Sequence, residues 1–220
     1  MFQSMSSLSA LMQLSFSKLG KKFYHRWIFR NLDCLVSAPT KLVLVGSNGS
    51  GKSTLMRILA GQLSPTEGKL SYTLGGKRIP LDKIYRHISW TAPYLDIYPD
   101  LNFLEHLRLH FRFKTCLLES PEAVIDRLRL SPHKDKKLRY YSSGMLQRAK
   151  VGIALFTQSD ILLLDEPTSN MDSQNAQRML ELIRTYSKGR LLILASNMDR
   201  EYEGTEHLLR LDDKGPIVGN

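Results

Sequence analysis

A glycine-rich stretch is the first part of this sequence whose residue types and spacing could do chemistry. Glycines allow positive φ and let the backbone approach a ligand closely. If a helix begins here, its unpaired N–H groups and its dipole attract an anion. Lys52 could reach the β- and γ-phosphates of a nucleotide, and Ser53 could ligate Mg²⁺. The alternative is a glycine-rich turn that binds nothing. The whole stretch reads Gly46, Ser47, Asn48, Gly49, Ser50, Gly51, Lys52, Ser53, Thr54.

Two adjacent carboxylates form a second candidate site. Asp165 and Glu166 follow the apolar run 161–164. Asp165 could hold the water shell of a Mg²⁺ ion that Ser53 ligates directly. Glu166, one residue further on, could orient or deprotonate an attacking water. Alone, the pattern could equally be an ordinary strand end. Together with the glycine-rich stretch 46–54, which we call the phosphate loop, it predicts a nucleotide–metal site.

The elements that must position these residues are short apolar strands that alternate with helices. The runs 42–45, 161–164 and 191–194 are typical of strands buried on both faces, and 173–186 has the spacing of an amphipathic helix. This alternation predicts an α/β fold with a mainly parallel sheet. Ligands of such sheets bind at the carboxyl ends of the strands, where Gly46, Asp165 and Ser196 all fall.

The N-terminal part has a different pattern, which predicts antiparallel strands. Residues 12–16 alternate, 18–26 are basic and turn-like, 27–36 are extended, and 69–74 alternate as an edge-type strand. From residue 101 the spacing becomes helical, and Ser120 is expected to cap a helix that begins at Pro121.

We expect a single domain over residues 1–220. Its core α/β lobe comprises 12–92 and 161–220, and a helical lobe comprises 93–160. Residues 1–11 could be a dispensable extension, so that either Met1 or Met12 is the true start.

Composition narrows the class of protein. No apolar run is long enough to span a membrane, and we identify no signal peptide. Cys34 and Cys116 are too few for a disulfide framework, which favours a reducing cytosol. The net charge is +10, but the densest basic cluster, 133–139, lacks aromatic residues for stacking bases. We interpret it as a solvated loop and expect no specific nucleic-acid partner.

His106 and His110 have the spacing of a metal pair but no third ligand.

One further motif lies between the phosphate loop and the acidic strand. It runs from Tyr141 to Arg148 and reads Tyr-Ser-Ser-Gly-Met-Leu-Gln-Arg. With this motif in place, nearly the whole chain resembles the ATP-binding cassette (ABC) ATPases, in which a Leu-Ser-Gly-Gly-Gln-like segment precedes the second acidic strand. Ser143 and Met145 depart from the commonest glycine and glutamine.

The resemblance implies further site residues. Ser142 and the Gly144 amide, at a helix N-terminus, would contact the γ-phosphate of ATP held by a second cassette. Asp172 would belong to the loop that crosses the dimer interface. Phe23, or failing that Tyr24, would stack on adenine, although either could be a simple surface aromatic.

Two positions depart from the family pattern. The glutamine expected after the strand at 88–92, which senses Mg²⁺ and links to the transporter, is replaced by Pro93-Tyr94. The histidine expected after the strand at 191–196 is Asn197, which can donate a hydrogen bond to phosphate but cannot carry a charge. Losing such a contact costs roughly a hundredfold or more in rate. Glu166 remains, so hydrolysis is still expected. Because the histidine is replaced, we expect it to be slow.

The resemblance implies that the chain binds ATP and Mg²⁺, pairs with a second cassette, expected to be an identical copy, and drives a separate membrane subunit. It would then be cytoplasmic and peripheral on the cytoplasmic face of the membrane. One rival is an ATP-gated clamp that does not hydrolyse ATP. Another is a soluble cassette acting on DNA or the ribosome, but such relatives usually carry two cassettes or a long coiled coil.

Overall fold

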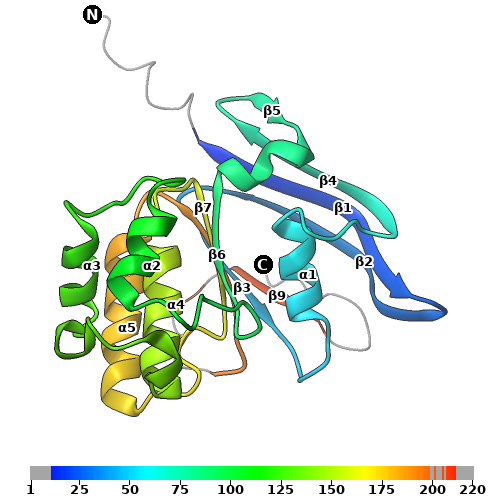
Figure 1. The fold of residues 1–220 in the computed structure, drawn as a ribbon. Coiled ribbons are helices and arrows are strands. Elements are labelled where there is room, and N and C mark those ends of the chain that lie inside the picture. The colour runs from blue at the N-terminus through cyan, green and yellow to red at the C-terminus, as the bar shows by residue number, and fades with distance from the viewer. Residues whose placement is uncertain (1–10, 199–200, 202–204, 206, 212–220) are drawn as a thin grey trace, which may run out of the picture.

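The computed structural model describes residues 11–198, 201, 205 and 207–211. Two sheets and a group of helices form its layers (Figure 1). The α/β fold with a parallel core sheet, an N-terminal antiparallel part and a helical part is confirmed. Residues 1–10 of the predicted N-terminal extension lie outside the described residues.

The antiparallel sheet has the strand order β2-β1-β4-β5. Its strands are β1 (Met12–Phe23), β2 (Arg26–Ser37), β4 (Glu67–Leu74) and β5 (Lys77–Ile79). Two predictions for this sheet are wrong. The basic segment 18–26 is strand as far as Phe23, because register shifts after Phe16 and Leu19 carry the β1–β2 pairing onward. The stretch 69–74 lies in an interior strand, because β4 pairs with both β1 and β5.

The second sheet is parallel, with the order β6-β7-β8-β3-β9. Its strands are β3 (Lys41–Val45), β6 (Ile88–Thr91), β7 (Ile161–Asp165), β8 (Leu191–Ala195) and β9 (His207–Arg210). Every residue of β7 and β8 is buried. Both faces of β7 and β8 are covered by other elements, which explains why their sequences are continuous apolar runs and do not alternate.

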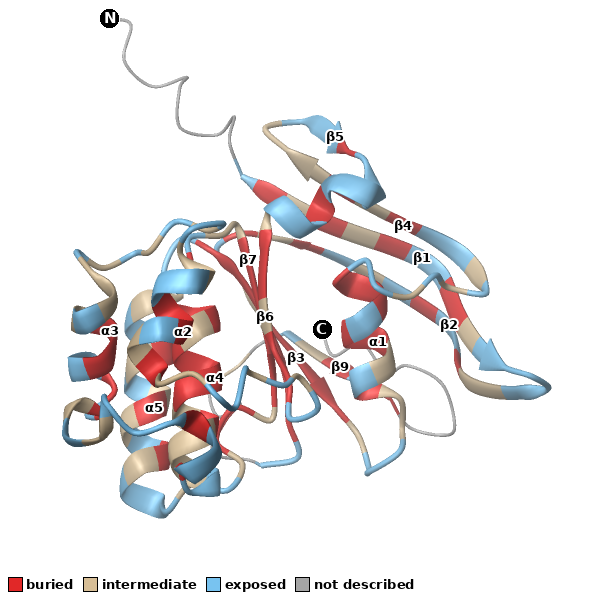
Figure 2. Cartoon of the chain, viewed as in Figure 1, coloured by how far each residue is buried: buried red, intermediate tan, exposed pale blue. Residues whose placement is uncertain are grey.

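Alternate residues of the central strands belong to two different cores. Leu163 and Ile193 pack with the antiparallel sheet and helix α1 (Lys52–Leu59), whereas Leu162 and Leu192 pack with the helices on the opposite face. Figure 2 shows the resulting band of buried residues along the parallel strands, with α1 between the two sheets. The sheet is thereby held on both sides, which fixes the positions of its strand ends.

The helices on the opposite face are α2 (Phe103–His110), α3 (Pro121–Arg127), α4 (Ser143–Leu155) and α5 (Ser173–Tyr186). Elsewhere in the chain, short 3-10 helices span Leu81–Arg86, Ser131–His133 and Leu138–Tyr140. Helix α2 begins in a capping box between Asn102 and Glu105. The predicted cap of α3 is confirmed, since Ser120 Oγ accepts from the Ala123 amide at 3.2 Å. No helix in the described part of the chain has the length and apolarity of a membrane span.

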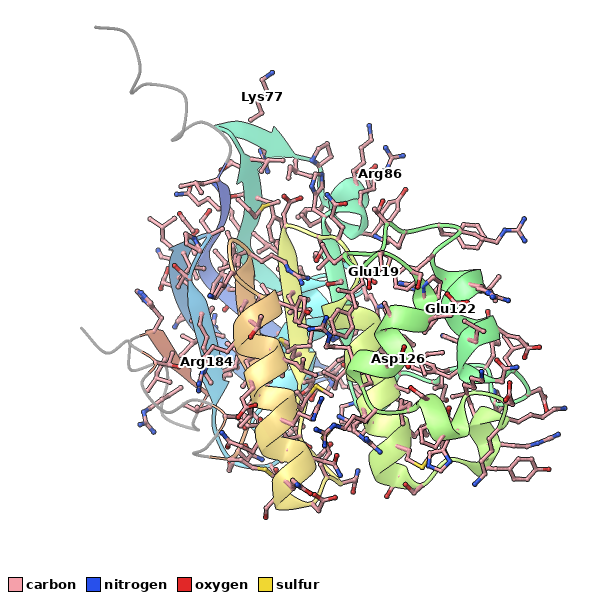
Figure 3. The ribbon with its side chains drawn as sticks, turned by 90° about the vertical axis from the view of Figure 1, so that its left-hand side faces the viewer. Lys77, Arg86, Glu119, Glu122, Asp126 and Arg184 are labelled. Atoms are coloured by element: carbon pink, nitrogen blue, oxygen red, sulfur yellow. The ribbon has the colours of Figure 1, made fainter. Side chains whose placement is uncertain are left out.

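Charged side chains are spread over several surfaces. Lys77 and Arg86 project near the antiparallel sheet, Arg184 projects from α5, and Glu119, Glu122 and Asp126 gather around α3 (Figure 3). The basic cluster 133–139 is mostly exposed. The described basic residues therefore form no single dominant arm.

Candidate nucleotide-binding site

The candidate site lies at the carboxyl edge of the parallel sheet. Strand β3 leads into the phosphate loop, β7 ends in Asp165, and β8 is followed by Ser196 and Asn197. These strands are neighbours, because β8 pairs with both β7 and β3, and Asp165 lies opposite Ala195 in the register. The fold thus brings the two sites predicted from sequence to one edge.

Two glycines of the loop stand where no side chain fits. Gly46 has φ +156°, and a Cβ there would lie 2.5 Å from the Leu211 carbonyl oxygen. Gly51 has φ +102°, and its Cβ would lie 2.6 Å from Ile28 Cγ2 of strand β2. The loop therefore packs against β2 at Gly51 and against the residue that follows β9 at Gly46. These contacts constrain the backbone whose N–H groups would bind phosphate.

Lys52 is folded back along this loop and is only 6% exposed. Its Nζ donates to the carbonyl oxygens of Gly46 at 2.8 Å and Ser47 at 3.1 Å. Burial lowers the pKa of Lys52, while the charges of Glu166 and Asp165 oppose that shift. The ammonium group is therefore placed at the loop, with both carboxylates within electrostatic reach.

Asp165 is 1% exposed, and its Oδ2 is buried without a hydrogen-bond partner among the described residues. Burial raises its pKa, a hydrogen bond from Ser53 opposes that shift, and the charge of Glu166 adds to it. A buried carboxylate with an unused oxygen beside a hydroxyl is an oxygen donor set of the kind Mg²⁺ takes. The residues present therefore fit Mg²⁺.

Glu166 and Asn197 face a common cavity of about 260 Å³, which Asn48 of the phosphate loop also lines. Asn197 Nδ2 donates a hydrogen bond to Asn48 Oδ1. Glu166 has φ +47°, an uncommon conformation for a non-glycine residue. A carboxylate and an amide thus converge beside the phosphate loop.

The Tyr141–Arg148 motif forms the start of α4. Ser142 is the exposed N-cap, and its Oγ accepts from the Met145 amide at 3.3 Å. A Cβ on Gly144 would lie 2.9 Å from the Asn170 carbonyl oxygen, so the motif lies directly against the loop that leads to Asp172. Asp172 caps α5. Ser142 and Asp172 are therefore on exposed surface that a second molecule can reach.

The two aromatic candidates lie at the β1–β2 turn. Phe23 is 41% exposed and Tyr24 is 96% exposed. Lys21 Nζ lies 5.0 Å from the centroid of the Phe23 ring. The side chains against Gly51 belong instead to Ile28 and Phe29. Adenine stacking by Phe23 or Tyr24 stays a prediction.

The sequence did not predict three polar residues around the site, Gln147, Lys150 and Glu201. Gln147 Nε2 donates to the Glu166 carbonyl oxygen at 3.0 Å, which joins α4 to the acidic strand end. Lys150, 9% exposed, donates to the Pro93 carbonyl oxygen at 3.0 Å. Glu201 is one of the residues that line the cavity. Of these residues, Lys150 could have been noticed in the sequence, because it is a charged residue between the apolar Ala149 and Val151.

Taken together, the fold and site define a P-loop nucleotide-binding protein of the α/β class. Residues 29–169 match the family model described as ABC transporter. The chain is 33% identical over 198 residues to the lipoprotein-releasing system ATP-binding protein LolD of Hydrogenovibrio crunogenus, covering 81% of this chain and 86% of that protein. It is 32% identical to ABC transporter A family member 1 of Dictyostelium discoideum, covering 94% of this chain but only 24% of that protein.

Solved structures share the fold. A dimeric post-hydrolysis state of the ATP-binding cassette MJ0796, bound to ADP and Pi, superimposes with a TM-score of 0.79 at 19% identity over 94% of this chain and 99% of that one. A putative ABC transporter ATP-binding protein from Pyrococcus furiosus gives 0.76 at 20% identity, covering 90% and 97%. The chain belongs to the ABC transporter family. It is an ATP-binding subunit of an ABC transporter, and the proteins of this family are ATPases.

Proposed function

We propose that this chain hydrolyses ATP slowly, with the residues at the carboxyl edge of the parallel sheet in separate roles. Lys52 and the amides of residues 46–54 bind the β- and γ-phosphates. Ser53 and Asp165 would hold Mg²⁺, which when bound neutralises charge on the phosphate oxygens. Glu166 accepts a proton from the attacking water. The observation that carries this proposal is the buried, unpaired Oδ2 of Asp165 beside Ser53, Lys52 and Glu166.

The slow rate follows from Asn197. The Asn197 side chain is a neutral amide, and it donates a hydrogen bond to Asn48. A cationic side chain at this position would stabilise the charge of the γ-phosphate better than a neutral one. The segment Pro93-Tyr94 likewise supplies no glutamine. Both features leave Glu166 in place, and turnover is therefore reduced and not abolished.

The proposed assembly is two identical copies with ATP between them. The phosphate loop of one copy and the Ser142–Gly144 helix start of the other would bind the same nucleotide, with Asp172 at the interface. The exposure of Ser142 and Asp172 supports this arrangement. The pair would act with a separate membrane-spanning subunit, and the chain would be peripheral on the cytoplasmic face of the membrane, with no specific nucleic-acid partner.

Phosphate release from the purified chain, with its membrane subunit present, tests the proposal. We expect Mg²⁺-dependent release that falls to background in Glu166→Gln, because the amide cannot accept a proton. Release at background level in both wild type and Glu166→Gln would contradict hydrolysis and favour an ATP-gated clamp instead. Failure to bind ATP, or to dimerise when ATP is added, would overturn the whole assignment.

A further inference from the structure

Glu201 is a buried acidic residue that the proposed mechanism leaves unused. It is 2% exposed. Its backbone oxygen accepts from Lys41 Nζ at 2.7 Å. Its Oε1 accepts from the Thr168 amide at 3.0 Å and also from the Thr168 hydroxyl. The backbone of Glu201 is therefore bonded to β3, and its carboxylate is bonded to the loop that follows β7.

The second carboxylate oxygen of Glu201 is not used by these contacts. Oε2 is buried and has no hydrogen-bond partner in the described part of the chain, and the same is true of Ser169 Oγ. Both residues line the cavity of about 260 Å³ that also contains Glu166 and Asn197. Buried polar atoms are almost always paired with protein or with ordered water, so this pair of orphaned atoms needs a partner.

Water suits this cavity in size and in chemistry. One water occupies about 30 Å³ in the liquid, and a buried water needs two to four polar partners. A water here can donate to Glu201 Oε2 and accept from the Ser169 hydroxyl. Its remaining hydrogen-bonding capacity is then available to Glu166. One N–H of Asn197 Nδ2 donates to Asn48, so a single amide N–H of Asn197 is left to donate to such a water.

We propose that Glu201 is a positioning residue whose free carboxylate oxygen, together with the Ser169 hydroxyl, holds an ordered water beside Glu166 in the hydrolytic cavity. This inference rests on the proposed function, because the water matters only where Glu166 activates a nucleophile. It adds a third carboxylate to the site, after Asp165 and Glu166, and this one acts through water and contacts neither the nucleotide nor the metal ligands.

Glu201→Gln is a nearly isosteric test. The glutamine retains an oxygen to accept from Thr168 but replaces the water-binding oxygen with an NH₂ group. We expect kcat to fall about ten- to hundredfold, the effect of one hydrogen bond to a charged group, with the Kd for ATP and the Tm unchanged. Glu119→Gln, on the exposed surface near α3 (Figure 3), is the matched control and should retain wild-type kcat. A wild-type kcat in Glu201→Gln would overturn the proposal.

Ser169→Ala completes a double-mutant cycle. If both side chains hold the same water, the double variant should be no slower than the slower single variant. Independent effects that multiply would contradict a shared water.

A crystal structure of the Glu166→Gln chain with ATP and Mg²⁺ provides a readout that does not depend on turnover. We expect a water within hydrogen-bond distance of Glu201 Oε2 and Ser169 Oγ. A protein group bonded to Oε2 in place of water would overturn the inference. If the wild type shows no hydrolysis above Glu166→Gln, the proposed function fails, yet this structure still decides whether Glu201 holds water.

Discussion

Asn197 donates a hydrogen bond from its Nδ2 to Oδ1 of Asn48, which joins the end of β8 to the phosphate loop. Both residues line the cavity that contains Glu166. The contact pairs two neutral side chains beside the phosphate loop, where the proposed mechanism requires phosphate charge to be stabilised. It is the structural basis of the slow turnover that we propose, and it indicates where the rate could be raised.

Asn197→His should increase turnover. An imidazole can carry a positive charge beside the γ-phosphate, and a donor of this kind contributes roughly a hundredfold to such rates. We expect kcat to rise by about ten- to a hundredfold in a phosphate-release assay at saturating ATP. The variant Asn197→Ala, which removes the contact with Asn48 without adding a charge, should be no faster than wild type. An unchanged kcat in Asn197→His would show that Asn197 does not limit the rate.

Lys52→Ala should nearly abolish ATP binding. The ammonium group lies inside the loop, and a charge-assisted hydrogen bond to phosphate contributes about 1.5–3 kcal/mol. We expect the Kd for ATP, measured by calorimetry, to increase by about a hundredfold. Lys77→Ala removes the same charge from the exposed strand β5 and should leave the Kd unchanged. Equal affinities for both variants would place the nucleotide elsewhere.

Ser142→Ala should weaken ATP-dependent dimerisation more than it weakens the fold. Ser142 caps α4 just as Ser120 caps α3, so either substitution costs about 1 kcal/mol of stability. Only Ser142 would also contact the partner's nucleotide. In a Glu166→Gln background, sedimentation should show at least a tenfold weaker ATP-bound dimer for Ser142→Ala and an unaffected dimer for Ser120→Ala. The same dimer affinity in both would argue against a role for the α4 N-terminus.

Acid should destabilise the chain through His110. Burial, followed by repulsion from His106 and Lys114, lowers the pKa of His110 from 6.5 to about 4. Because the folded pKa is depressed, its contribution is present above pH 6.5 and is lost as the pH falls toward 4. Thr157 donates its hydroxyl to Ile153, so it accepts a hydrogen bond from His110 Nε2.

Urea unfolding at pH 7.5 and pH 5 measures this effect. The loss of unfolding free energy between these pH values should be about 1 kcal/mol smaller in His110→Gln than in wild type, after allowing for the partial exposure of the ring. His25→Gln, in the exposed β1–β2 turn, is the control and should retain the wild-type difference. An identical difference in His110→Gln would contradict the assignment.

The centre of the parallel sheet and its carboxyl edge were predictable because β3, β7 and β8 contain continuous apolar runs followed by glycine or polar residues. Helix α5 was also correctly predicted over 173–186, since its apolar spacing and its end near Gly189 agree. In these elements local propensity and tertiary burial point the same way. The N-terminal sheet was less predictable, because the β1–β2 pairing continues through register shifts and basic residues that local sequence assigns to a turn.

The contacts that complete the site could not be read from local pattern. Gln147 and Lys150 lie on a helix, but their partners are backbone carbonyls of Glu166 and Pro93, far away in the sequence. Nothing in the local sequence distinguishes Glu201 from an exposed acidic residue after a strand. Its burial and its hydrogen bond with Thr168 depend on the fold. Such roles depend on which loops meet at the sheet edge, and only the three-dimensional arrangement shows that.

The most direct test of the central claim is a crystal structure of the Glu166→Gln chain with ATP and Mg²⁺, read for one distance. It is the separation between Ser142 Oγ of one copy and the γ-phosphate of the ATP bound at Lys52 of the other. We predict a hydrogen bond, about 2.5–3.0 Å, across a two-fold axis. An ATP molecule bound at Lys52 with no second copy near its γ-phosphate, or Ser142 far from every nucleotide, would contradict the account.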